Sequence, residues 1–183
     1  MGITITEALA EIKTIGKRLE KKREFVQQYL AQPERIKDPF EKDGGSQAVL
    51  SQEMQSISDL EGRQIQLRVA ISRINDQTQL AIDGTSRTIN EWLVWRREVA
   101  PGQEAFMTKL MQLLGGLQKE AQQRGARMVG AGAAVAVGDS QPTDIIVNID
   151  ERKLSENREK LQNVLGQLDG QLSLKNATLT LDI

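Results

Sequence analysis

The chain of 183 residues carries 24 basic and 25 acidic side chains, and only 3% of its residues are aromatic. The balanced charge gives no overall field that would point to nucleic acid or to an anionic membrane. The chain contains neither cysteine nor histidine, which excludes disulfides, thiol nucleophiles, zinc sites and Ser-His-Asp catalysis.

A first long helix is predicted from Thr4 to about Gln32. Thr4 and Glu7 have the spacing of a capping box, in which each side chain bonds a free backbone amide at the helix start. Apolar residues follow in steps of three and four, at Ile5, Ala8, Ile12, Ile15, Leu19, Val26 and Tyr29. Two prolines and a glycine pair then predict a loop from Pro33 to Ser46, which Ile36 and Phe40 would hold against the helices.

A second long helix is predicted from about Gln47 to Gln79. Its apolar seam again steps by three and four residues, through Leu50, Met54, Ile57, Leu60, Leu67, Ile71 and Ile74. Two helices of roughly 30 residues joined by one loop are expected to lie antiparallel, seam against seam, as a coiled-coil hairpin.

A third helix is predicted to begin at Thr88, after a turn around Gly84. Thr88 and Glu91 repeat the capping box, and "TINEWL" echoes "TITEAL" of the first helix; a common start signal accounts for this echo without an ancestral duplication. Pro101 and Gly102 predict a kink or break after Ala100. The apolar stripe comprises Ile89, Trp92, Leu93, Val99, Phe106, Leu110, Leu113, Leu114 and Leu117.

The last third of the chain changes to the two-residue period of strands. Alternation predicts a strand at 129–137, a second strand in "TDIIVNID" through Ile145, Val147 and Ile149, a helix from about Glu151 to Leu168, and a final strand from Leu174 to Ile183. The fold class is therefore α+β and mainly α: a long antiparallel helical hairpin, a third helix and a small C-terminal strand-strand-helix-strand region. Two domains are expected, at residues 1–125 and 126–183.

Two charged groups of residues have a functional and a structural interpretation. The basic run from Lys17 to Arg23 could contact phosphate, but interleaved glutamates favour a solvated helix face. Four carboxylates flank the predicted strands, and their spacing matches no calcium loop, so they are interpreted as turn residues; they are Asp139, Asp144, Asp150 and Glu151. No catalytic, cofactor-binding or metal-binding residue is predicted, and no cofactor is expected.

The residues that best fit a protein interface lie early in the third helix and in the last strand. Tryptophan and arginine are common interface anchors; Trp92 fits the apolar stripe, whereas Trp95 projects partly off it. The last strand would leave an apolar edge that invites pairing with another chain. The interface candidates are Trp95, Arg96, Arg97, Leu179, Leu181 and Ile183.

Three segments carry a resemblance to a known family: "ITEALAEIKTIGKRLEKKREFV", "LRVAISRINDQTQLAIDGTSRTINEWLVWRREV" and "LSENREKLQNVLGQLDGQLSLKNATLTLDI". Their shared features are an opening helix with Ala-Leu and basic residues, an Ile-Asn-x-Thr helix end, an Asp-Gly turn followed by threonines, and a terminal helix leading to Asn-x-Thr. Together they resemble the septicolysin-like family of bacterial and phage coiled-coil proteins. The resemblance implies a helical hairpin scaffold and supplies no catalytic residue.

The function predicted from the sequence is that of a non-enzymatic structural or assembly protein. It would be a self-associating coiled-coil subunit of a larger particle, for which a phage virion is the favoured setting. The expected partners are further copies of the chain and other structural proteins, with no membrane and no specific nucleic acid. A virion or the cytoplasm is the expected location, since the N-terminus lacks a signal-peptide pattern. The alternatives are a membrane-active, cytolysin-like protein and a nucleic-acid-binding module that uses the run from Lys17 to Arg23.

Overall fold

The computed structural model describes residues 2–130 and 144–182, which form long helices with a few short strands, as predicted. The chain divides into two compact units: unit 1 is Met1–Thr78 with Leu172–Ile183, and unit 2 is Gln79–Gln171. The boundary expected at residue 125 lies inside unit 2. The reason is that the helices before and after it share one core, in which Leu114 packs with Val147 and Leu154.

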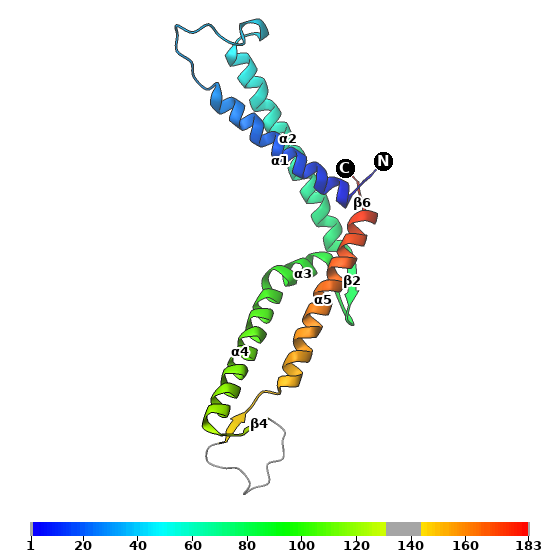
Figure 1. Ribbon diagram of the computed structural model, residues 1–183. Helices are drawn as coiled ribbons and strands as arrows, with labels where there is room; N and C mark the ends of the chain where they lie inside the picture. The colour runs from blue at the N-terminus through cyan, green and yellow to red at the C-terminus, as the bar shows by residue number, and fades with distance from the viewer. Residues whose placement is uncertain (1, 131–143, 183) are drawn as a thin grey trace. The chain divides into compact units, whose positions relative to one another are not determined.

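Unit 1 contains the predicted helical hairpin. Helices α1 (Ile5–Gln28) and α2 (Ser46–Gln77) lie side by side and run in opposite directions (Figure 1). The predicted apolar stripe of α1 is buried along this contact. Its core comprises Ile5, Ala8, Ile12, Ile15 and Leu19 of α1, Leu67 of α2 and Leu181, with Ile57, Leu60, Ala70, Ile71 and Ile74 of α2 packed against it.

Both ends of the α1–α2 hairpin are fixed by local contacts. The capping box is present: the Glu7 amide donates to the Thr4 hydroxyl oxygen at 3.2 Å, and the Thr4 amide donates to the Glu7 carboxylate at 2.7 Å. In the connecting loop, which contains the short 3-10 helix η1 (Glu41–Asp43), Phe40 packs on Phe25 and Tyr29 as expected. Asp38 starts α2 by accepting a hydrogen bond from the Ser46 amide at 2.8 Å.

The C-terminal segment differs from the prediction, because helix α5 (Glu151–Thr178) continues through the first half of the predicted strand. Leu168 and Leu172 extend its buried stripe at helical spacing, and this burial outweighs the alternating pattern that follows. Only β6 (Thr180–Leu181) is extended, and it pairs antiparallel with β1 (Ile3–Thr4) of the same chain. The edge that was expected to need another chain therefore has an internal partner.

Unit 2 opens with a hairpin of β2 (Gln79–Ile82) and β3 (Thr85–Thr88), where the sequence indicated only a turn. Its two-residue loop places Asp83 at φ 48° and Gly84 at φ 75°, the left-handed geometry that suits tight antiparallel hairpins. The loop residues were predicted correctly. The flanking strands are polar on one face, so they lacked a strong strand signal.

The helix predicted to begin at Thr88 consists of two helices joined by one π-helical turn. Helix α3 (Ile89–Val94), the π turn η2 (Trp95–Val99) and α4 (Ala100–Arg124) follow one another without interruption. The second capping box is present at Thr88 and Glu91. Pro101 does not break the helix; it lies in the first turn of α4, directly after the π turn.

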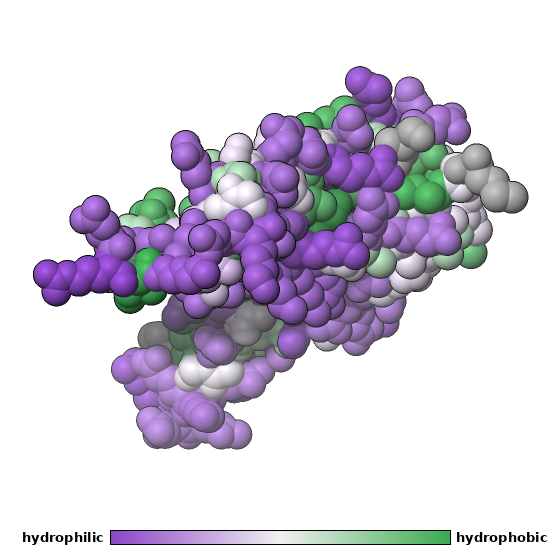
Figure 2. Space-filling view, turned by 90° about the horizontal axis from the view of Figure 1, so that it is seen from above, coloured by the Kyte–Doolittle hydropathy of each residue, from purple (hydrophilic) through white to green (hydrophobic). Residues whose placement is uncertain are grey.

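The far end of unit 2 joins α4 to α5 through a short parallel pair, β4 (Met128–Gly130) and β5 (Ile145–Val147). The rest of the strand predicted at 129–137 lies outside the described residues. Apolar side chains on the face seen in Figure 2 form small separate patches among hydrophilic ones. This pattern agrees with narrow cores along helix seams.

Candidate functional site

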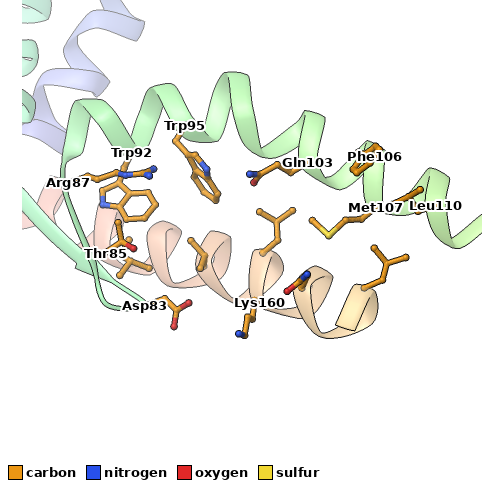
Figure 3. A pocket seen from close by; sticks show the side chains of 15 residues that line it. Asp83, Thr85, Arg87, Trp92, Trp95, Gln103, Phe106, Met107, Leu110 and Lys160 are labelled. Atoms are coloured by element: carbon orange, nitrogen blue, oxygen red, sulfur yellow. The ribbon is translucent and has the colours of Figure 1, made fainter. Parts of the chain in front are cut away.

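A groove of about 610 Å³ with a mainly apolar lining lies in unit 2. Four parts of the unit enclose it: the loop end of the β2–β3 hairpin, α3 with its π turn, α4 and α5 (Figure 3). The backbones of α4 and α5 approach each other less closely than those of α1 and α2 do. Side chains therefore fill the space between α4 and α5 only partly, and the groove remains.

Two tryptophans form one end of the groove. Trp92 is 3% exposed, and its indole N–H donates to the Leu80 carbonyl of β2 at 3.0 Å. The Arg87 guanidinium lies 5.0 Å from the centre of its ring. Trp95 meets Trp92 edge to face, with 5.4 Å between ring centroids, and is half-buried. Trp92 is thus a core residue, as predicted, and of the two tryptophans Trp95 is the one that a ligand could reach.

The long walls of the groove come from α4 and α5. Helix α4 contributes Phe106, Met107 and Leu110, and Phe106 is 64% exposed. Helix α5 contributes mainly aliphatic side chains, namely Leu154, Leu161 and Val164. Most of the lining is therefore aliphatic or aromatic.

The polar groups of the groove stand apart from one another. Asp83, Arg87 and Lys160 lie along it (Figure 3), and in the part of the chain that the structure describes no hydrogen bond or ion pair joins any two of them. An apolar channel with a few separated polar groups is typical of a site that binds and orients a partner.

Only one of the predicted interface residues lines this groove. Trp95 does so, while Arg96 pairs with Asp169 of α5 at 2.8 Å and Arg97 pairs with Glu98 at 2.8 Å, both near solvent. The prediction for the last strand was wrong at Leu181, which is fully buried in the core of unit 1. Leu179 packs half-buried against that core, and Ile183 lies outside the described residues.

The carboxylates considered as cation ligands serve local structure. Asp150 accepts hydrogen bonds from the Arg152 and Lys153 amides at the start of α5. Asp144 accepts one from the Arg127 amide at 3.3 Å, and Glu151 accepts one from Gln118 at 3.1 Å; Asp139 lies outside the described residues. Within residues 2–130 and 144–182 no group of three or more acidic side chains could hold a metal ion.

Part of the basic run on α1 is held in ion pairs with α2. Lys22 meets Glu53 and Arg23 meets Glu61, each at 2.6 Å. Lys17, Arg18 and Lys21 are exposed. The arrangement matches the solvated helix face that the interleaved charges favoured. In the described part of the chain no helix is long and apolar enough to cross a membrane.

Most of the groove was not predicted from the sequence, although one pattern in α4 indicates which face packs inward. Along α4 the small or apolar residues Ala100, Met107, Leu114 and Ala121 recur at a strict seven-residue spacing; Met107 is half-buried and the other three are buried. That spacing identifies the face of α4 that packs toward α5. Its first two residues each follow by one position the predicted apolar residues Val99 and Phe106.

Comparison of the chain with protein-family models, with curated proteins and with solved structures found no match.

Proposed function

We propose that the protein is a non-enzymatic assembly subunit that associates with further copies of itself and with other structural proteins of a larger particle. The observation that carries the proposal is the groove of unit 2, with Trp95 and the 64% exposed Phe106 at an open apolar surface. Exposed apolar surface beside aromatic anchors is characteristic of protein contacts. The sequence resemblance is what suggests a phage particle as the setting.

The lining of the groove supports binding of protein. Aliphatic and aromatic side chains give a partner apolar area to bury, at about 25 cal/mol per Å². Arg87 and Lys160 give it polar groups to orient against. These features match the hydrophobic centre and polar rim of a protein interface.

The mass of the purified protein in solution tests this proposal. Light scattering across a concentration series should give a multiple of the 20.4 kDa chain mass, with dissociation on dilution if association is reversible. A mass of one chain throughout the micromolar range would contradict self-association.

A further inference from the structure

Helix α4 carries two apolar faces. The first consists of Ala100, Met107, Leu114 and Ala121, which pack within unit 2. The second lies one residue earlier at the same spacing: Val99, the last residue of η2, is 43% exposed, and Phe106 and Leu113 of α4 are 64% and 53% exposed. One residue of an α-helix turns by about 100°, so the two faces are separated by about a right angle. This is the arrangement of a helix that contacts two neighbours in a bundle.

The π turn is the cause of the second face. Val99, Phe106 and Leu113 continue the seven-residue series that starts at the buried Trp92. In η2 the Ala100 amide donates to the Trp95 carbonyl five residues earlier, which inserts one extra residue into the helix. The extra residue turns Ala100, and the residues that follow it at seven-residue spacing, toward the core. Val99, Phe106 and Leu113, which follow the buried Trp92 at the same spacing, are left exposed.

The second face alternates large and small residues. Between its apolar side chains stand Gly102, Lys109 and Gly116. At both glycines a Cβ would meet no atom within 4 Å apart from the local helix backbone. The face therefore offers protruding side chains at Phe106 and Leu113 and open holes at the glycines, which is what knobs-into-holes packing requires.

We propose that the second face of α4 binds the same face of a second copy of the chain, with the two helices antiparallel. This inference rests on the proposed self-association and names the surface that performs it. An antiparallel contact in which Phe106 fills the hole at Gly116 of the partner subunit also sets Leu113 beside Lys109 of the partner subunit. The aliphatic stem of that lysine covers the leucine while its ammonium group reaches water.

The charges and shapes on this face favour a second copy and this direction. A parallel pair would set Lys109 against its own copy, and each of Gly102 and Gly116 against its own copy, giving a like-charge contact and two voids. The antiparallel pair removes these defects, and the flanking Ala105 and Gln112 are uncharged. Large residues thus meet small ones twice across one symmetric contact.

Charge reversal and cross-linking together test this contact. Phe106→Lys should halve the mass measured by light scattering, because it places a charge in each copy of the contact without touching the core. Ile65→Lys is the matched control, since Ile65 is 63% exposed on α2, and its mass should equal that of the wild type. Both variants should keep the helical circular dichroism of the wild type.

The chain lacks cysteine, so introduced thiols report the direction without background. Ala105→Cys and Lys119→Cys variants, each exposed on α4, should cross-link through a short bis-maleimide when mixed. Either variant alone should give little product, because identical positions lie on the order of 18 Å or more apart along antiparallel helices at about 1.5 Å per residue.

A protein that associates but keeps its mass in Phe106→Lys, or gives no cross-link in the mixture, overturns this inference and leaves self-association standing. A wild type with the mass of one chain at every concentration overturns the proposed function and this inference together.

Discussion

Unit 1 and unit 2 begin with the same local structure and end with different packing. In each, a two-stranded antiparallel ribbon leads into a helix whose first turn is closed by a threonine-glutamate capping box. The first helical residues, Ile5 and Ile89, are both 1% exposed, and the partner strands bury Leu181 and Leu80. The start of a helix therefore does not determine how closely its neighbour packs.

The difference lies in the residues that follow the cap. The two units can be aligned on their capping threonines, Thr4 and Thr88. The seam residues Ile12, Ile15 and Leu19 of α1 then correspond in unit 2 to Arg96, Val99 and Gln103. The first three are buried, whereas none of the second three is. Unit 1 consequently closes along α1 and α2, and unit 2 keeps an open groove between α4 and α5.

A resemblance between the first and second halves of the chain extends beyond the helix starts. Helix α2 with β2 and helix α5 with β6 carry identical residues at one constant spacing along the chain. These pairs are Leu60 and Leu161, Gln66 and Gln167, Leu67 and Leu168, Ser72 and Ser173, Asn75 and Asn176, and Leu80 and Leu181. The order of strand, helix, helix and strand is therefore repeated along the chain, and the likeness is not limited to the two capping boxes.

The largest expected effect is the loss of unit 1 in Ile15→Asp. Ile15 is 3% exposed within the α1–α2 core, and an unpaired buried charge costs a free energy comparable with the whole stability of a domain, about 5–15 kcal/mol. Circular dichroism should show a large loss of helix. Both tryptophans are in unit 2, so their fluorescence reports whether that unit stays folded.

Leu9→Asp is the control for that substitution, because Leu9 is 42% exposed on the same helix and should tolerate the charge. An unchanged melting temperature in Ile15→Asp would show that unit 1 does not depend on its closed seam.

A smaller effect is expected from Trp92→Ala in unit 2. Trp92 corresponds to Ala8 of unit 1, which is fully buried. At this position unit 2 therefore buries a large ring, where unit 1 buries a methyl group. Removal should lower the free energy of unfolding by about 3–5 kcal/mol and should also leave the Leu80 carbonyl without its indole donor. Urea unfolding followed by Trp95 fluorescence measures the change.

Trp95→Ala is the matched comparison, because that ring is half-buried and its indole N–H makes no hydrogen bond within the part of the chain that the structure describes. Equal losses of stability in the two variants would mean that both rings belong to the core and that the groove has no accessible aromatic end.

The sequence predicted the helical hairpin and both capping boxes because these depend on local spacing and on one long seam. It did not predict the groove, because a π turn leaves no composition signal: Trp95 to Val99 read as ordinary helix. It also misassigned Leu174 to Thr178, where alternating apolar residues compete with a helix already stabilised by Leu168 and Leu172. Such competition is decided by tertiary packing.

Deletion of Arg97 should convert unit 2 toward the closed pattern of unit 1. Removing one residue from the π turn restores α-helical register and turns Phe106 and Leu113 by about 100°, into line with Trp92. The larger side chains should fill the groove, so binding of an apolar fluorescent dye should fall several-fold. Repacking should change the free energy of unfolding by only about 1–3 kcal/mol.

Arg97→Ala keeps the residue count and should leave dye binding unchanged, since the ion pair that Arg97 makes within the described residues is with its neighbour Glu98, near solvent. Unaltered dye binding after the deletion would show that the π turn does not hold the groove open.

The smallest expected effect concerns an ion pair between α1 and α2 of unit 1. Arg63 of α2 donates to Glu11 of α1 at 2.8 and 3.3 Å, and this hydrogen bonding lowers the pKa of the Glu11 carboxyl below its ordinary value of 4.5. A carboxyl whose pKa is lower in the folded state contributes stability above the unfolded-state pKa and loses it as the pH falls through the folded value. Both side chains are 37% exposed, so the contribution should be only about 0.2–1 kcal/mol.

Glu11→Gln should therefore lower the urea midpoint of unit 1 slightly at pH 7, and the difference from the wild type should vanish well below pH 4.5. A difference that persists undiminished in acid would assign the effect to packing of the side chain and not to its charge.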